Sequence, residues 1–187
     1  MLLQGATACL QAVLMGIDVV ARRKTCKRFN EPGHAHSLTF SCSERKPLLE
    51  AGRTKQVLID SLAAARVRHR FDIWAYVIMP EHMHLLIWPR ELEYRISTIL
   101  AAIKRPVAFQ ARQAGLTAGP HFWLPGGGFD SNLYEADTIR AEIDYIHKNP
   151  VRRGLCQKPE EWRYSSAAFW AGQTDVPLVM DRTVPQI

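Results

Sequence analysis

Two histidines separated by one residue, His82 and His84, have the spacing of a metal site on a strand. They belong to HMHLLIW (82–88), a run of strongly β-forming residues. Because side chains alternate across a strand, both imidazoles point to one face, with their Cα atoms about 6.5–7 Å apart. At that separation, two ring nitrogens can reach one ion at about 2.1 Å each. The pair also fits two partly buried histidines that are satisfied by local hydrogen bonds.

A second pair, His34 and His36, has the same spacing. It lies beside Pro32 and Gly33, in a turn-rich stretch where strict alternation is not assured. We therefore rank His34 and His36 below His82 and His84 as a candidate metal site.

Tyr145 and Asn149 are four residues apart in a predicted helix, so they share one of its faces. The isoleucines at 139, 143 and 146 form the stripe that should face the core. Each polar residue also has a plain structural explanation: a tyrosine beside a core, and an asparagine that ends a helix before Pro150. The chain continues with three cations able to hold phosphates: Lys148, Arg152 and Arg153.

Hydrophobic periodicity predicts one α+β domain with an antiparallel sheet. Its elements are expected at 36–42 (strand), 47–69 (helix), 71–79 and 82–88 (a strand hairpin), 91–116 (a helix kinked or interrupted by Pro106), 121–134 (strand and loop) and 137–149 (a helix stopped by Pro150). This order predicts a ferredoxin-like split βαββαβ sandwich followed by an additional C-terminal helix. Helices should cover one sheet face and leave the other free for chemistry.

The composition favours a polyanionic partner. The 187 residues include 24 Lys plus Arg against 18 Asp plus Glu, which gives a net charge of +6. Such a surplus fits nucleic acid first and an acidic membrane surface second. The proportions exclude disordered, collagen-like and disulfide-scaffold proteins. The cysteines are scattered, which predicts reduced thiols rather than a four-cysteine metal site: Cys9, Cys26, Cys42 and Cys156.

Residues 1–22 are expected to form a poorly ordered extension. The first 21 are mildly apolar, but no basic region precedes them and they are short for a membrane span. Five cations between 22 and 28 form either a solvated arm or a phosphate contact. Residues 173–187 are expected to form a frayed tail.

Several separated segments resemble the REP-associated tyrosine transposases, a branch of the single-tyrosine HUH transposases with an IS200-like domain. They are MPEHMHLLIW, IDYIHKNPVRRGL, PEEWRYSSA, NEPGHAHSLTFSC, AIKRPVAF and FWLPGGGFDSNLY. The resemblance covers about 23–172 in the family's order. It implies a ferredoxin-like core that cuts and rejoins single-stranded or hairpin DNA from palindromic repeats.

The resemblance also implies roles for particular residues. Tyr145 would be the nucleophile, and Asn149 would join His82 and His84 as the third ligand of Mg²⁺ or Mn²⁺. Attack by Tyr145 would give a 5′-phosphotyrosine and a free 3′-hydroxyl, and reversal would rejoin strands. The candidate DNA phosphate contacts are Lys104, Arg105, Lys148, Arg152 and Arg153.

Two other functions remain open from the sequence. One is a non-catalytic nucleic-acid-binding module, since ferredoxin-like sheets also bind RNA. The other is a metal-dependent nuclease that uses water, with Tyr145 only structural. We expect a cytoplasmic, nucleoid-associated protein without a membrane partner, acting as a monomer or a homodimer.

Overall fold

The computed structural model describes residues 28–117, 119, 121–126 and 128–185. The described residues form four strands and four helices, in this order along the chain: β1 (Ala35–Ser41), α2 (Gly52–His69), β2 (Phe71–Ile78), β3 (His82–Pro89), α3 (Ile96–Gln113), β4 (Phe129–Leu133), α4 (Ala136–Arg152) and α5 (Ala167–Trp170). Short 3-10 turns occupy Ser43–Arg45 and Pro159–Glu161. The expected βαββαβ order, followed by a further helix, is confirmed.

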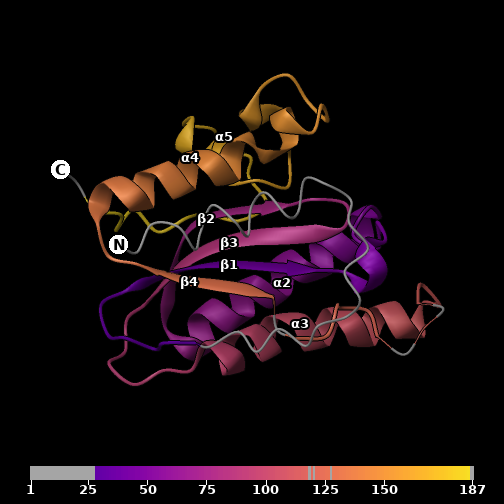
Figure 1. Ribbon diagram of the computed structural model, residues 1–187. Helices are drawn as coiled ribbons and strands as arrows, with labels where there is room; N and C mark the ends of the chain where they lie inside the picture. The colour runs from indigo at the N-terminus through magenta and orange to yellow at the C-terminus, as the bar shows by residue number, and fades with distance from the viewer. Residues whose placement is uncertain (1–27, 118, 120, 127, 186–187) are drawn as a thin grey trace, which may run out of the picture.

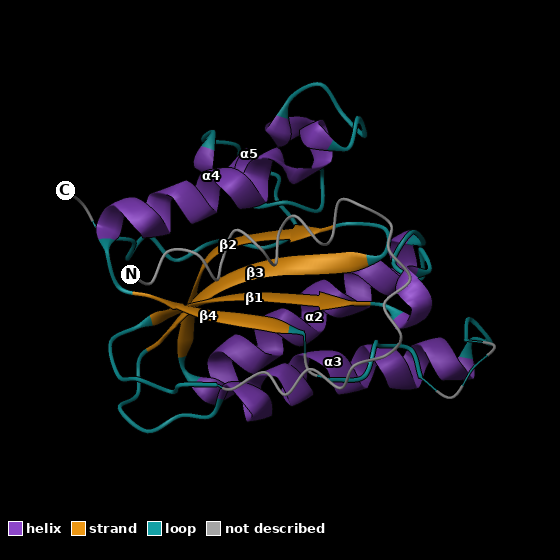
Figure 2. Cartoon of the chain, viewed as in Figure 1, coloured by secondary structure: helices purple, strands orange, loops and turns teal. Residues whose placement is uncertain are grey.

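The strands form one antiparallel sheet in the order β2-β3-β1-β4. This is the arrangement of a ferredoxin-like fold, with the two helices α2 and α3 side by side beneath one sheet face (Figure 1, Figure 2). The predicted hairpin joins β2 to β3 through Pro80 and Glu81, and it is closed by the Met79 N–H donating to the His82 carbonyl at 2.8 Å. The two central strands of the sheet are β3 and β1, which are adjacent in space although α2 and β2 separate them in the sequence.

β3 is buried on both faces. Met83, Leu85 and Ile87 belong to the core that β1, α2 and α3 enclose. Leu86 belongs to a second apolar cluster with Trp74 and residues of α4. The sequence predicted a free second face, and this was wrong: α4 lies along it, on the side of the sheet opposite α2 and α3 (Figure 2).

The apolar stripe of α4 explains why the helix covers the sheet. Ile139 and Ile146 are buried in the second cluster and Ile143 packs against it. Burying these side chains removes apolar area from water on both the helix and the sheet, worth about 25 cal/mol per Å². The residues for which we expected an open face therefore lie in the layer between the sheet and α4.

Neither proline ends its helix. Pro106 lies inside α3, and α4 continues through Pro150 to Arg152. Proline removes one helical N–H and disfavours the helix interior, but Pro150 is buried and only two residues from the helix end. Beyond it, the Arg153 N–H donates to the Asn149 carbonyl, and Gly154 takes a positive φ of 67° that suits a helix end.

Two helices begin five residues later than predicted, at Gly52 and Ile96. The start of α3 is set by a distant side chain, because the Ile96 N–H donates to Asn30 Oδ1 at 3.0 Å. Such a cap satisfies a helix N–H that the helix itself cannot. Periodicity alone carries no sign of this partner.

A buried histidine joins α4 to the far strand. His147 Nε2 lies 2.8 Å from Ser166 Oγ, and the Tyr76 N–H of β2 donates to the same hydroxyl at 2.9 Å. Burial lowers the pKa of His147 from 6.5 to about 4, although Asp144 acts in the opposite direction. The histidine is therefore neutral at pH 7, and its docked position depends on its staying so.

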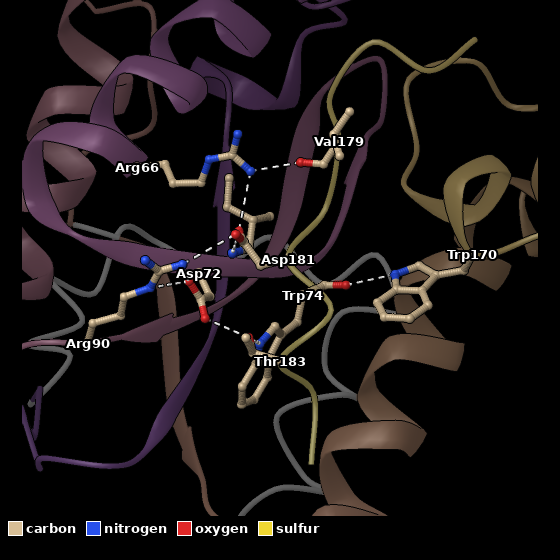
Figure 3. Close-up of polar contacts among 9 residues, drawn as sticks. Arg66, Asp72, Trp74, Arg90, Trp170, Val179, Asp181 and Thr183 are labelled. Atoms are coloured by element: carbon tan, nitrogen blue, oxygen red, sulfur yellow. Dashed lines mark hydrogen bonds and ion pairs between the residues drawn. The ribbon is translucent and has the colours of Figure 1, made fainter. Parts of the chain in front are cut away.

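The C-terminal segment, described to residue 185, packs against the rest of the domain, whereas we predicted a frayed tail. Leu178 and Met180 are buried in the core, and the Asp181 carboxylate accepts from the Ile73 N–H and from Arg66. Figure 3 shows this segment crossing the end of the sheet. There the buried carboxylate of Asp72 pairs with Arg90 and accepts from the Thr183 hydroxyl.

The predicted extension at 1–22 and most of the basic arm at 22–28 lie outside the described residues. Within the part of the chain that the structure describes, none of the helices has the length and apolar character needed to cross a membrane.

The replacement His147→Gln should make folding less sensitive to acid. Because the unfolded histidine takes up a proton near pH 6.5 and the folded one only near 4, its contribution is complete above pH 6.5 and declines as the pH falls towards 4. Wild type should lose about 2 to 3 kcal/mol more unfolding free energy than the variant between pH 7 and 4.5, measured by urea unfolding. Equal losses in the two proteins would contradict this role.

Candidate active site

The two histidines of β3 approach each other closely. His82 Nε2 lies 3.0 Å from His84 Nε2, and the rings are nearly perpendicular, with centroids 4.8 Å apart. Two ligands at right angles around one ion, each about 2.1 Å from it, are about 3.0 Å apart. The residues present therefore fit a divalent cation held by both Nε2 atoms.

Both imidazoles are oriented by hydrogen bonds from their other nitrogen. His82 Nδ1 donates to Glu81 Oε1 at 3.0 Å. His84 Nδ1 lies 2.8 Å from the hydroxyl of Thr39, its directly paired neighbour on β1. A carboxylate only accepts, whereas a hydroxyl both donates and accepts. Glu81 thus fixes the tautomer of His82, while Thr39 accommodates either tautomer of His84.

Burial keeps both imidazoles neutral at physiological pH. It lowers the pKa of His84 from 6.5 to about 3, and the neighbouring His82 contributes in the same direction. Burial also lowers the pKa of His82, against the opposing effect of Glu81. Neutral imidazole is the form that binds a metal, so both rings are in that form at physiological pH.

Tyr145 lies beside this pair within the same chain. Its ring centroid is 5.6 Å from that of His84, in an edge-on arrangement, and the Arg152 guanidinium lies 5.3 Å from the tyrosine ring. The tyrosine is partly buried. The structure therefore brings Tyr145 to the histidine pair, which lies some sixty residues earlier in the sequence.

Asn149 follows one helical turn after Tyr145. Its Nδ2 donates to the Tyr145 carbonyl at 2.7 Å, and among the described contacts none joins its side chain to either imidazole. Within the described residues no three His, Cys, Asp or Glu side chains converge. A cation at the histidine pair would thus need further ligands besides the two nitrogens. That the amide oxygen of Asn149 is one of them stays a prediction.

Cations surround the C-terminal end of α4. Lys148, Arg152 and Arg153 are exposed there. Lys148 pairs with Asp144 at 3.4 Å, and Arg153 Nη1 donates to Glu81 at 2.5 Å. Arg45, which the sequence reading did not single out, also lies near enough to lower the pKa of His82. This end of the site is suited to an anion.

Lys104 and Arg105 lie on α3, beyond the opposite face of the sheet (Figure 1). Lys104 is partly buried, with its ammonium 5.4 Å from the Phe40 ring and 5.5 Å from the Trp123 ring. Burial, and then the charge of Arg28, lower its pKa. Arg105 is exposed. Neither Lys104 nor Arg105 therefore lies with the histidines and Tyr145.

The second histidine pair has separate partners. His36 is fully buried, with Nδ1 2.8 Å from Asp130 and Nε2 2.8 Å from the Tyr94 hydroxyl. The His34 ring packs against that of Tyr134 in a tilted arrangement, with centroids 5.0 Å apart. These contacts occupy the His36 nitrogens, consistent with the lower rank given to this pair.

Several polar residues of the site gave no recognisable signal in the sequence. Ser37 Oγ donates to Glu142 Oε1 at 2.6 Å, one helical turn before Tyr145. Burial raises the pKa of Glu142, although the hydrogen bond from Ser37 lowers it. Thr39 becomes recognisable only once the β1–β3 register is known, whereas Glu81 could have been noticed as the carboxylate next to His82.

Comparisons with known proteins show which family the chain resembles. The family described as "Transposase IS200 like" matches residues 33–149. The REP-associated tyrosine transposase of Escherichia coli (strain K12) is 25% identical over 59% of this chain. The match spans 63% of that relative, less than two thirds of its length. These matches confirm the resemblance drawn from the sequence segments.

A solved structure shares the fold. It is described as "Structure of the REP associates tyrosine transposase bound to a REP hairpin", and it is 22% identical with a TM-score of 0.66. The alignment covers 86% of this chain and 96% of that one. The likeness confirms the α+β ferredoxin-like architecture with its additional helix.

In the metal-free protein, His84 should stay neutral as the pH falls from 7 to about 4, because burial lowers its pKa to about 3. Imidazole ¹⁵N and ¹H chemical shifts, recorded by NMR across that range, report its protonation directly. The exposed His121 provides a comparison within the same spectra. A His84 midpoint near 6.5 would show that the imidazole is more accessible to water than described.

Proposed function

We propose, from the premise that this chain belongs to the IS200-like transposase family, that it cleaves and rejoins single-stranded DNA through a tyrosine–DNA intermediate. One observation supports the proposal most directly: the Tyr145 ring lies 5.6 Å from His84, whose Nε2 is 3.0 Å from that of His82. A phenol and a potential metal site are thereby adjacent within one chain.

Tyr145 acts as the nucleophile on the scissile phosphate. Its attack forms the phenol–phosphorus bond of a 5′-phosphotyrosine and releases a 3′-hydroxyl as the leaving group. Attack by another 3′-hydroxyl reverses the step and rejoins DNA without ATP, since the phosphodiester energy stays in the covalent bond. A tyrosine hydroxyl is a weak nucleophile at neutral pH and needs assistance.

His82 and His84 hold the divalent cation that would assist, and Asn149 contributes its amide oxygen. When bound, the cation neutralises phosphate charge and orients the phosphate for in-line attack. Because all three protein ligands are uncharged, they leave the cation's full charge for the phosphate. Ligand softness favours Mn²⁺ over Mg²⁺ at two imidazoles, so we expect Mg²⁺ or Mn²⁺ in function and strong support by Mn²⁺ in vitro.

The DNA would lie across the C-terminal end of α4, where Lys148 and Arg152 contact phosphates. Such contacts position a strand without reading its bases. Lys104 and Arg105 would serve only DNA long enough to reach the α3 side of the sheet. The relative's name and the hairpin-bound structure point to palindromic repeat hairpins as substrate. The catalytic unit would be residues 23–172, acting as a monomer or a homodimer.

A water-using nuclease and a non-catalytic binder differ from this proposal in one observable. A strand transferase leaves protein covalently attached to the 5′ end of the downstream DNA. A nuclease cuts without attachment, and a binder leaves the strand intact. DNA hairpins labelled at the 5′ end or the 3′ end, analysed on denaturing gels, distinguish these outcomes.

Replacing Tyr145 with Phe should abolish the covalent adduct and leave hairpin binding within about twofold, because only the attacking oxygen is removed. Denaturing gels measure the adduct and fluorescence anisotropy measures binding. Tyr134→Phe is the matched control, since this exposed tyrosine at the end of β4 should keep wild-type adduct formation. Cleavage by Tyr145→Phe at the wild-type rate would favour the nuclease.

Replacing His84 with Ala should remove both Mn²⁺ binding and cleavage, because one of two adjacent nitrogen ligands is lost. Mn²⁺ affinity is measured by isothermal titration calorimetry without DNA, and cleavage with and without added metal. His121→Ala, at an exposed histidine, should behave as wild type. Metal-independent cleavage by His84→Ala would count against the metal site.

A further inference from the structure

One carboxylate links the histidine strand to the tyrosine helix. Glu81 Oε1 accepts from His82 Nδ1 at 3.0 Å and from Arg153 Nη1 at 2.5 Å. Glu81 lies in the turn between β2 and β3, and Arg153 is the residue that caps the C-terminal end of α4. The chain thus has a direct polar connection between the two parts of the site, on elements far apart in sequence.

The connection is partly shielded from water. The Glu81 side chain is 15% exposed and that of His82 is 16% exposed, whereas Arg153 is about half exposed. Hydrogen bonds to charged groups gain strength where water is excluded. Removing either partner of Glu81 would leave a largely buried carboxylate under-satisfied, which is costly. The geometry therefore resists rearrangement from the His82 side and from the Arg153 side.

Glu81 determines which nitrogen of His82 can bind a metal. The carboxylate accepts at Nδ1, so Nδ1 carries the proton and Nε2 keeps its lone pair, directed towards His84 Nε2 at 3.0 Å. An acceptor behind a ligating histidine fixes ring orientation and raises ligand basicity. Thr39 also contacts the Nδ1 atom of His84 from β1, but its hydroxyl suits either tautomer, is uncharged and has no contact with α4 among those described.

Arg153 places the same carboxylate in contact with the tyrosine helix. It lies one turn after Asn149 and about two turns after Tyr145, so fixing it fixes the helix end that carries both. The opposite end of this face is held by Ser37 and Glu142 at 2.6 Å. Tyr145 therefore lies between two polar attachments of α4 to the sheet, one on β1 and one at the start of β3.

We propose that Glu81 is a positioning residue that couples cation binding at the histidine pair to the docking of α4 through Arg153. This inference rests on the proposed function, because it concerns the cation that His82 and His84 would hold. It gives Arg153 a role within the protein in place of a standing contact with DNA. Losing the Glu81–Arg153 pair weakens cation binding even when no DNA is present.

The test compares Mn²⁺ affinity, without DNA, of wild type, Glu81→Gln, Arg153→Met and the double variant. Glu81→Gln should weaken Mn²⁺ binding about tenfold or more, the range found when such supporting groups are removed. Arg153→Met should weaken it by a smaller factor, and the double variant should be no weaker than Glu81→Gln, because both changes break one linkage. Arg140→Met is the matched control: it removes an exposed α4 cation that donates to the Pro185 carbonyl at 3.2 Å, away from the histidine pair, and should leave Mn²⁺ affinity unchanged.

The outcomes separate this proposal from the proposed function. If His84→Ala abolishes Mn²⁺ binding while Glu81→Gln and Arg153→Met bind as wild type, the positioning role is overturned and the metal site stands. If His84→Ala also binds Mn²⁺ normally, the metal site itself fails. Arg153→Met could instead keep its Mn²⁺ affinity while its hairpin affinity falls and depends less steeply on salt concentration. That result would assign Arg153 to phosphate binding and overturn the link to Glu81. Thermal unfolding of each variant verifies folding, and Arg153→Met supplies the answer if Glu81→Gln fails to fold.

Discussion

The alternation of side chains along β3 is the constraint on which the rest of the site depends. Met83, Leu85 and Ile87 are buried against α2 and α3, so His82 and His84 must point the other way. A slip of one residue in register would turn the imidazoles into the apolar core and move Met83, Leu85 and Ile87 out of it, to the face that α4 covers. The cost of that exchange fixes the histidines on one face. The 3.0 Å approach of the two Nε2 atoms therefore depends on packing of the opposite face of β3 against α2 and α3.

A second constraint is that α4 must lie on the histidine face. Its isoleucines contribute the apolar part, through Ile139 and Ile146. Polar attachments determine where along the sheet the helix rests: Glu142 at Ser37, His147 at Ser166, and Arg153 at Glu81. Hydrogen bonds are directional, whereas apolar burial is not. The position of Tyr145 beside His84 therefore reflects these polar contacts more than the amount of buried surface.

The fold was largely predictable from the sequence because its information is local. Two runs of strongly β-forming residues predicted β2 and β3 with the intervening turn, and the isoleucine spacing predicted the core face of α4. The covering of the second sheet face was missed, since amphipathic spacing says which side of a helix is apolar and not which surface it meets. Helix boundaries failed where a distant partner decides them, as Asn30 does at Ile96, or where burial outweighs a local preference, as at Pro150. Within the site, spacing singled out His82 and His84, and the family resemblance implied Tyr145. Thr39 could not be identified, because its place beside His84 depends on the strand register.

The hydrogen bond between the two imidazoles has a consequence for cation uptake. With Glu81 accepting from His82 Nδ1, the proton shared between the Nε2 atoms must reside on His84, and His84 Nδ1 then accepts from the Thr39 hydroxyl. If this pair holds a cation as proposed, His84 would lose the proton on Nε2 and carry one on Nδ1 instead, and the net charge of the pair would be unchanged. The Thr39 hydroxyl would then change from donor to acceptor. Cation uptake would be a tautomer exchange rather than a deprotonation, and its signature would be the direction in which one threonine hydroxyl points.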